Sequence, residues 1–432
     1  MASLVDFAYY GALLLSSPAL ALKFGRPRGR RHLAGLRQRL GACRRRSSRR
    51  PCIWIHGVSV GEIVAAAPLI EALHTHLPDY EVVLSTTTST GQQVAKKSYP
   101  GLRVIYYPLD FTWAVRRVLD AIRPDLVILV ELEIWPNFLS EAYRRKIPVA
   151  LVNGRISERS FSRYRYVRGW LFDPLGKVGR FCVQTERYAD RFRQLGLPAD
   201  QIYVTGSMKY DQLQLSQADG AEIRREIGIG ASETVLIGGS THPSEERALV
   251  EAYRALREAT PDLRLVLVPR HTERAAEVAR IVREAVGEPV LRSQQLEARE
   301  PTLPPGAVLL VDTIGELGRL YSAADVVFVG GSLIPHGGQN MLEPVAFGKP
   351  TVFGPHWDNF KEQVERLSAA RGVREVKDAA ELTQVLGEFL RNPEEARAMG
   401  ARGRDALLAA RGATERTLEV LRTYLRERTA QA

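Results

Sequence analysis

The chain has 432 residues, of which 45% are hydrophobic and 25% are charged. This length exceeds one ordinary core, so we expect two domains of about 200 residues each, and the composition excludes a largely disordered chain. The three cysteines lack a CxxC motif and clustered histidines, so they support neither a disulfide framework nor a structural zinc site. We therefore expect a globular protein of a reducing compartment.

The net charge of +11 is concentrated in one basic segment. Twelve lysines and arginines and no acidic residue lie between Lys23 and Arg50, so the rest of the chain is nearly neutral. The preceding residues 7–22 are uncharged, but they are fewer than the roughly 20 of a spanning helix, and Pro18 would kink them. An apolar segment followed by clustered cations predicts an N-terminal anchor that binds anionic lipid on the cytoplasmic face. The alternative is a buried helix followed by a solvated basic loop.

Short β-rich runs alternate with helical patterns from Cys52 to about Gly206. We expect strands at residues 53–55, 81–85, 103–106, 126–130, 149–152, 180–183 and 202–204. We expect helices at residues 63–77, 112–122, 136–145 and 186–195. This alternation is typical of right-handed βαβ crossovers and predicts a parallel sheet.

The second half repeats this scheme, starting with the strand and turn of TVLIGGSTHPSEER. Further strands are expected at residues 263–268, 308–311, 326–329 and 351–353. Helices are expected near residues 273–286, 316–323, 341–347 and 360–370, with two or three more at the end. We predict four segments. Residues 1–50 are the apolar and polybasic segment, and residues 51–206 and 207–410 form two doubly wound α/β domains that face a cleft. Residues 411–432 form a helix that is expected to pack back on the first domain.

The stretch PCIWIHGVSVGEIVAAAPLIEAL has the layout of a phosphate-binding loop: a strand, a turn with Gly57 and Gly61, and a helix expected directly after Glu62. A carboxylate occupies the position of the anion, so a nucleotide phosphate is not expected here. The helix dipole would keep Glu62 ionised, as a general base requires. If the protein transfers a group from a nucleotide, this domain is therefore expected to bind the acceptor substrate and the other domain the nucleotide. A first-turn glutamate that only favours the dipole is the alternative.

In LVILVELEIWPNF, an apolar strand runs into Glu131 and Glu133. Carboxylates at a strand's carboxyl end are costly unless they are paired or used, and alternation would put both on one face if the strand continued. Catalysis by Glu131 and a structural salt bridge both remain open.

Three cationic or basic side chains follow other strands: Lys209 in GSMKYD, and Arg270 with His271 in VPRHTER. Arginine offers a bidentate fork to phosphate, and lysine offers a point charge. A surface salt bridge is the alternative for Arg270. We interpret His271 as a hydrogen-bonding loop residue, because nothing nearby completes a metal-ligand set.

Residues 325–360 form the most informative loop. A strand ends in Gly330 and Gly331, and a helix is expected to begin around Asn340. Glycines allow close approach of a ligand, and the helix N-terminus favours a phosphate. Glu343 could accept hydrogen bonds from ribose hydroxyls. Capping of the helix by Asn340 and Glu343 alone is the alternative.

Six motifs together resemble the bacterial Kdo transferases, which move 3-deoxy-D-manno-octulosonic acid (Kdo) from CMP-Kdo to a lipid A precursor at the inner membrane. The motifs occur in the family's order along nearly the whole chain: SVGE, ELEIWPN, GSMKYD, VPRHTER, TIGEL and GGSLIPHGGQNMLEPVAFGKP. The resemblance implies a GT-B fold, inversion at the anomeric carbon, and neither metal nor cofactor.

The resemblance also implies roles for individual residues. Glu62 is similar to the family's general base, and Glu131 and Lys209 are similar to its transition-state stabilisers. The implied contacts with CMP are Pro269, Arg270, Ile314, Gly315, Glu316, Asn340, Met341, Leu342 and Glu343. The sequence departs from the family pattern at Thr272, Ile314 and Gln339, where proline, methionine and histidine are commoner.

A second basic cluster interleaves with aromatic residues in NGRISERSFSRYRYVRGW. We expect it to contact the membrane or the acceptor, and a solvated helix face is the alternative. Its members are Arg155, Arg159, Arg163, Arg165 and Arg168. Two rival functions differ from Kdo transfer: a GT-B transferase or epimerase that uses a UDP-sugar, and a membrane-tethered RNA-binding protein. No RRM or KH signature supports RNA binding, so no nucleic-acid partner is expected.

Overall fold

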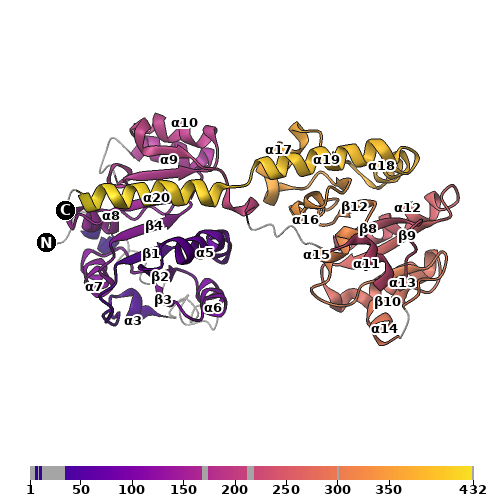
Figure 1. Ribbon diagram of the computed structural model, residues 1–432, viewed down its shortest axis with the longest axis horizontal. Coiled ribbons are helices and arrows are strands. Elements are labelled where there is room, and N and C mark those ends of the chain that lie inside the picture. Colours follow the sequence, from indigo (N-terminus) through magenta and orange to yellow (C-terminus); the bar gives the residue numbers. More distant parts are fainter. Residues whose placement is uncertain are drawn as a thin grey trace. The chain divides into compact units, whose positions relative to one another are not determined.

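The computed structural model describes residues 5–7, 9–11, 35–167, 174–211, 218–298 and 301–430. The chain divides into two compact units, residues 1–212 with 410–432 and residues 213–409. Each unit has one seven-stranded parallel sheet with helices packed against it (Figure 1). The predicted α/β fold with two parallel sheets is confirmed. We predicted a second domain from residue 207, whereas the compact division follows residue 212, so Lys209 belongs to the first unit.

The first sheet has the strand order β3-β2-β1-β4-β5-β6-β7. Its strands are β1 Cys52–His56, β2 Glu81–Thr86, β3 Arg103–Tyr106, β4 Leu126–Val130, β5 Val149–Gly154, β6 Arg180–Val183 and β7 Ile202–Val204. The central strands are buried on both faces, as expected for a parallel sheet covered by helices.

The helices of the first unit lie between these strands. They are α3 Leu36–Arg39, α4 Val60–Ala65, α5 Ala67–His76, α6 Ser89–Ser98, α7 Thr112–Ile122, α8 Pro136–Arg144, α9 Glu158–Val167, α10 Glu186–Gln194 and α20 Ala413–Ala430. Short 3₁₀ turns occur at η2 Leu175–Lys177, η3 Ala199–Gln201 and η4 Met208–Tyr210.

Alternation along β1 divides the first unit's core between the two faces of the sheet. Ile53 and Ile55 pack in one cluster with residues of α5 and α20, and Trp54 packs in another with residues of α7 and α8. The single helix predicted at residues 63–77 is two helices, because Pro68 lacks an N–H and is accommodated in the first turn of α5. Helix α6 was not predicted.

Helix α20 belongs to the first unit although it ends the chain. It lies beside α5 (Figure 1), and Leu418 and Leu421 are fully buried in the cluster with β1. The carboxylate of Asp211 accepts hydrogen bonds from the backbone N–H groups of Gly412 (2.7 Å) and Thr414 (2.6 Å) at the helix start. A carboxylate at this end also interacts favourably with the helix dipole.

The second sheet has the order β10-β11-β9-β8-β12-β13-β14. Its strands are β8 Thr234–Thr241, β9 Leu263–Pro269, β10 Val290–Leu291, β11 Val308–Leu310, β12 Val326–Val329, β13 Thr351–Phe353 and β14 Arg374–Glu375. The two-residue strands β10 and β14 at the edges were not predicted, because so short a run has no readable period.

The second unit's helices are α11 Gly220–Glu226, α12 Glu245–Leu256, α13 Ala275–Ala285, α14 Arg292–Glu297, α15 Leu317–Leu320, α16 Leu342–Ala346, α17 Lys361–Ala369, α18 Ala379–Arg391 and α19 Pro393–Ala409. Short 3₁₀ turns are η5 Thr272–Arg274, η6 Tyr321–Ala323 and η7 Asp358–Phe360. Residues of α12, α13 and α18 form one buried cluster with the central strands of the second sheet.

Candidate active site

The predicted acidic residues of the first unit follow neighbouring strands. Strand order reverses between β1 and β4, and ligands of open α/β sheets bind at such a switch point. Glu62 follows β1, and Glu131 and Glu133 follow β4. The negative charge of Glu131 acts on the pKa of Glu62, and the charges of Glu62 and Glu131 act on the pKa of Glu133, so the three side chains lie near one another.

Glu62 is the third residue of α4, and the expectation that the helix begins after it is wrong. Ser59 caps the helix, and its hydroxyl accepts a hydrogen bond from the N–H of Glu62 (3.4 Å). The Glu62 carboxylate in turn accepts hydrogen bonds from the Ser59 hydroxyl (2.9 Å) and the Val58 N–H (2.8 Å). The carboxylate therefore fixes the turn that carries it, in a variant of the capping box.

The pKa of Glu62 is raised from its ordinary value. Burial is the largest cause, and the hydrogen bonds from Val58 and Ser59 only partly offset it. Burial thus opposes the helix dipole, and the prediction that Glu62 is ionised stays a prediction. A raised pKa makes the ionised carboxylate a better proton acceptor.

Glu131 has left-handed backbone, with φ of 62°, directly after the last residue of β4. This conformation is strained for a side chain other than glycine, and such strain is often found at active sites. Its Oε2 atom lies 2.7 Å from the Arg155 guanidinium, which follows β5. Glu131 therefore takes part in an ion pair at the switch point, and this pair does not exclude a catalytic role.

Glu133 accepts a hydrogen bond from the Trp135 indole N–H (3.0 Å). Burial, followed by the negative charge of Glu62, raises the pKa of Glu133 to about 7. The strand ends at Val130, so the condition under which alternation would place Glu131 and Glu133 on one strand face is not met.

This raised pKa predicts a pH-dependent cost in stability. An unfolded glutamate has a pKa near ~4.3, so the folded chain binds the Glu133 proton more tightly and loses stability as the pH rises from about 4 to about 7. Glu133→Gln keeps an acceptor for Trp135 and removes the titration. We expect its free energy of unfolding to exceed that of wild type by about 1–2 kcal/mol near pH ~8, after discounting for partial exposure, with little difference near pH ~4.

Urea unfolding of both proteins at the two pH values measures this difference. The exposed Glu71→Gln on α5 controls for loss of a surface carboxylate. A difference that stays the same at both pH values would show that Glu133 titrates like an ordinary glutamate.

Lys209 lies in η4, at half-buried depth, after the edge strand β7. The neighbouring Met208 N–H donates to the Asn153 side chain at the end of β5 (3.2 Å), so η4 is held at the carboxyl edge of the sheet. Asn153 also has left-handed backbone (φ 52°), and the sequence analysis did not single it out. An Asn-Gly pair directly after a strand is the signal that could have indicated it.

The second basic cluster is only partly a continuous feature. Arg155 precedes α9 and pairs with Glu131, whereas Arg159, Arg163 and Arg165 are exposed on α9. Arg168 lies outside the described residues. The structure thus assigns Arg155 to the acidic site.

In the second unit, the predicted nucleotide contacts also follow strands. Pro269 ends β9 and Arg270 is exposed after it, while Ile314 is 86% exposed in the loop after β11. Gly315 has φ of 93°, a conformation that favours glycine. Glu316 has a lowered pKa: burial raises it, but hydrogen bonds from Thr313 and Arg319 outweigh that effect.

The segment Asn340, Met341, Leu342 and Glu343 forms the start of α16. The helix begins one residue later than predicted, because Met341 rather than Asn340 is the N-cap residue. The Asn340 side chain accepts from the Leu342 N–H (3.1 Å) and donates to Glu343 (2.8 Å). Burial raises the pKa of Glu343.

A buried carboxylate holds the glycine-rich loop of this unit. Glu245, at the start of α12, is 0% exposed and accepts hydrogen bonds from four backbone N–H groups. One belongs to His242 (2.9 Å), and the others to Gly331 (2.7 Å), Ser332 (2.9 Å) and Leu333 (2.9 Å). The loops after β8 and β12 are therefore fixed to each other by one side chain.

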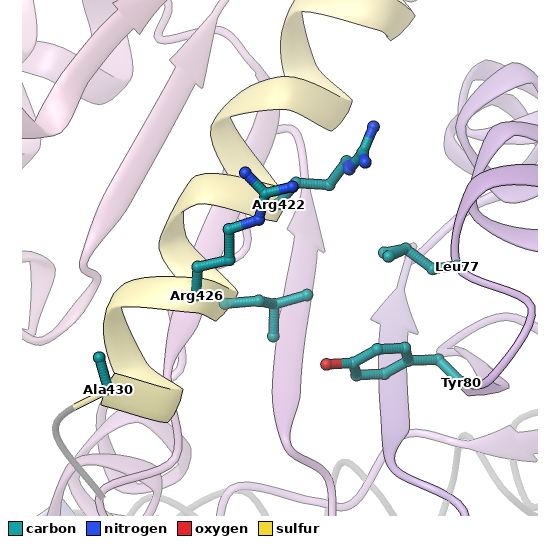
Figure 2. A pocket seen from close by; sticks show the side chains of 6 residues that line it. Leu77, Tyr80, Arg422, Arg426 and Ala430 are labelled. Atoms are coloured by element: carbon teal, nitrogen blue, oxygen red, sulfur yellow. The ribbon is translucent and has the colours of Figure 1, made fainter.

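A hollow among the described residues of the first unit lies at the amino-terminal edge of its sheet. It has a volume of about 470 Å³ and is lined by Leu77, Tyr80, Arg422, Leu425, Arg426 and Ala430. Figure 2 shows these side chains. Tyr80 directly precedes β2, so this hollow lies at the amino-terminal edge, away from the acidic residues. In the described part of the chain, no cluster of three or more His, Cys, Asp or Glu residues could hold a metal ion.

Part of the predicted N-terminal anchor is described. Residues 5–7 and 9–11 are helical, and Asp6 accepts hydrogen bonds from the Thr112 N–H (2.9 Å) and the Asn137 amide (3.0 Å). The rest of residues 7–22 lies outside the described residues. Of the helices described, none combines the length and the apolar character needed to cross a bilayer.

Part of the basic segment after the anchor is structural. Arg46 is buried and pairs with Glu81 (3.0 Å), and it also donates to backbone carbonyls of Arg50 and Ile122. This arginine therefore serves the packing of the first unit rather than a surface.

Comparison with known proteins identifies the family. The family model of 3-deoxy-D-manno-octulosonic-acid transferase (kdotransferase) matches residues 34–212. A 3-deoxy-D-manno-octulosonic acid transferase of Haemophilus influenzae is 34% identical over 432 residues, covering 97% of this chain and 98% of the relative. The chain belongs to the Kdo transferase family. It is therefore a glycosyltransferase. A Kdo transferase of Bordetella pertussis is 35% identical over 383 residues, covering 86% of this chain and 87% of the relative.

Solved structures agree on the fold. The UDP-GlcNAc 2-epimerase of Neisseria meningitidis aligns with a TM-score of 0.54 over 86% of this chain and 100% of the epimerase, at 14% identity. This likeness supports the GT-B fold, with two Rossmann-like units, that the resemblance implies. At this identity it carries no information about the substrate.

Proposed function

We propose that this Kdo transferase moves Kdo from CMP-Kdo to a lipid A precursor (lipid IVA), with inversion at the anomeric carbon and without a metal. The observation that carries the proposal is the conjunction of family membership with the half-buried, hydrogen-bonded Glu62 near Glu131 and Glu133. The first unit would bind the acceptor, and the second would bind CMP-Kdo.

In this proposal Glu62 removes the proton from a primary sugar hydroxyl of the acceptor as that oxygen attacks the anomeric carbon. Its raised pKa suits the task, and its hydrogen bonds orient it. Glu131 and Lys209 would stabilise the transition state. CMP leaves as a phosphate monoester, and nearby cations would stabilise the charge that develops on it, an effect often worth several kcal/mol.

The proposed nucleotide contacts are those of the second unit. They comprise Pro269, Arg270, Ile314, Gly315, Glu316, Asn340, Met341, Leu342 and Glu343. Exposed loop backbone at Ile314 and Gly315 allows close approach, and Arg270 offers a fork for phosphate.

We further propose that the chain works at the cytoplasmic face of the inner membrane, held by residues 7–22 and anionic lipid. The exposed arginines of α9, Arg159, Arg163 and Arg165, would contact the membrane or the acceptor's phosphates. Replacing them with alanine should raise the KM for the acceptor and leave that for the donor unchanged. An acceptor KM equal to that of wild type would show that these arginines do not bind the acceptor.

The deciding experiment is incubation with CMP-Kdo and tetra-acylated lipid IVA, followed by mass spectrometry of the product. We expect the mass of one or more added Kdo residues, with inhibition by CMP and not by UDP. Absence of a Kdo product, together with sugar transfer when a UDP-sugar replaces CMP-Kdo, would favour the rival function.

A further inference from the structure

Three imidazoles meet at the carboxyl edge of the second sheet. His271 follows β9, His242 follows β8, and His336 lies in the loop after β12; these strands are neighbours in the order β9-β8-β12. The ring centroids of His242 and His336 are 4.2 Å apart, and those of His242 and His271 are 6.0 Å apart. Residues distant in sequence are thus brought together by strand order.

This cluster lies at a favoured position for a ligand. The order of the second sheet reverses between β8 and β12, and His242 and His336 belong to the loops on the two sides of that switch point. Arg270, a proposed nucleotide contact, directly precedes His271. The cluster is therefore adjacent to the proposed phosphate site within the same unit.

The cluster is held in place by the surrounding structure. Glu245 binds the backbone of His242 and of the loop that leads to His336. The Gln339 amide nitrogen lies 3.1 Å from His242 Nε2. An amide N–H can only donate, so Nε2 accepts and the His242 proton resides on Nδ1. That N–H is a donor.

The electrostatic surroundings of His242 are positive. Burial, followed by the charges of His336, His271, Arg274 and Arg270, lowers the pKa of His242 to about 4. Two carboxylates of α12 are engaged elsewhere, since Glu245 accepts backbone N–H groups and Glu246 pairs with Arg274 (2.7 Å). The exposed Glu273 carboxylate lies 3.7 Å from His271 Nδ1, so it would have to turn away when an anion binds. Such surroundings repel a cation and attract an anion.

We propose that His242, His271 and His336 form a subsite for the carboxylate of the donor sugar acid, beside the nucleotide phosphate. This inference rests on the proposed function. In a 2-ulosonic acid the anomeric carbon bears both the carboxylate and the phosphate ester, so the enzyme needs two adjacent anion sites. In this assignment Arg270 serves the phosphate, and the imidazoles serve the carboxylate.

The test uses the full chain with saturating CMP and labelled imidazoles. Free Kdo and its neutral methyl ester are titrated separately while the histidine resonances are followed by NMR. We expect Kdo to shift the three imidazoles and the ester to leave them unchanged. Absence of any Kdo effect, or equal effects of acid and ester, would overturn the subsite.

Variants separate the carboxylate from the phosphate. His271→Gln and His336→Gln alter exposed side chains, so folding should be retained, and the exposed His76→Gln on α5 is the matched control. We expect a KM for CMP-Kdo about tenfold higher, as for loss of a charge-assisted hydrogen bond, with a Kd for CMP within about twofold of wild type. An equal loss of CMP affinity would assign the imidazoles to phosphate and overturn the proposal.

The two proposals fail differently. If the wild-type chain transfers no Kdo, the proposed function fails. If it transfers Kdo and both variants keep the wild-type KM for CMP-Kdo, only the carboxylate subsite fails.

Discussion

Glu62→Gln is expected to lower kcat by about 10²–10⁴ while the protein remains folded, because the proposed reaction loses its general base. Glutamine also occurs at this position of capping boxes, so the turn should persist. Its carbonyl can still accept the hydrogen bond from Val58 or from the Ser59 hydroxyl. Steady-state kinetics with CMP-Kdo and lipid IVA, together with thermal unfolding, measure both quantities.

The pH dependence gives an independent readout for Glu62. Only the ionised carboxylate accepts a proton, so wild-type kcat should rise with pH through the raised pKa of Glu62, above the range of an ordinary glutamate. The variant's residual rate should lack that rise. A variant with wild-type kcat, or with the same acidic limb, would show that Glu62 serves only to cap α4.

The second large effect is expected from Glu245→Ala. This change leaves four backbone N–H donors without their buried acceptor. Each unsatisfied buried group costs about 1–3 kcal/mol, and relaxation of the loops recovers part of that, so we expect a loss of about 3–5 kcal/mol in stability. Urea unfolding measures the loss, and CMP affinity should fall because the loop leading to Asn340 is no longer held.

A matched substitution on the same helix controls for the loss of a glutamate. Glu251 is exposed on α12, so Glu251→Ala should change stability by less than about 0.5 kcal/mol. If the Glu245 variant is equally mild, the loops after β8 and β12 are held together by other contacts.

Much of the fold was predictable because parallel strands buried on both faces are nearly continuous apolar runs. Strands β3, β4, β6, β7, β12 and β13 match their predicted bounds. Two-residue edge strands and helix α6 were not predicted, since they carry no strong apolar period. The start of α4 was misplaced because Ser59, rather than the glycines, caps the helix.

The candidate site was predictable as a set of loops but not as a set of contacts. Strand ends followed by Glu62, Glu131 and Arg270 could be read in order along the chain. The ion pair of Glu131 with Arg155 could not be predicted, because it depends on which strands are neighbours. The left-handed backbone of Glu131 also had no signal in the sequence.

The sequence by itself determined the two α/β units, the family and the residue types available for chemistry. It did so because apolar periodicity and ordered motifs are local properties of the chain. Only the tertiary structure decided the protonation and pairing of those residues. Burial raised the pKa of Glu62 and Glu133, and strand order brought His242 beside His336. Solvation and distance between remote segments are properties of the packed molecule, so no local pattern encodes them.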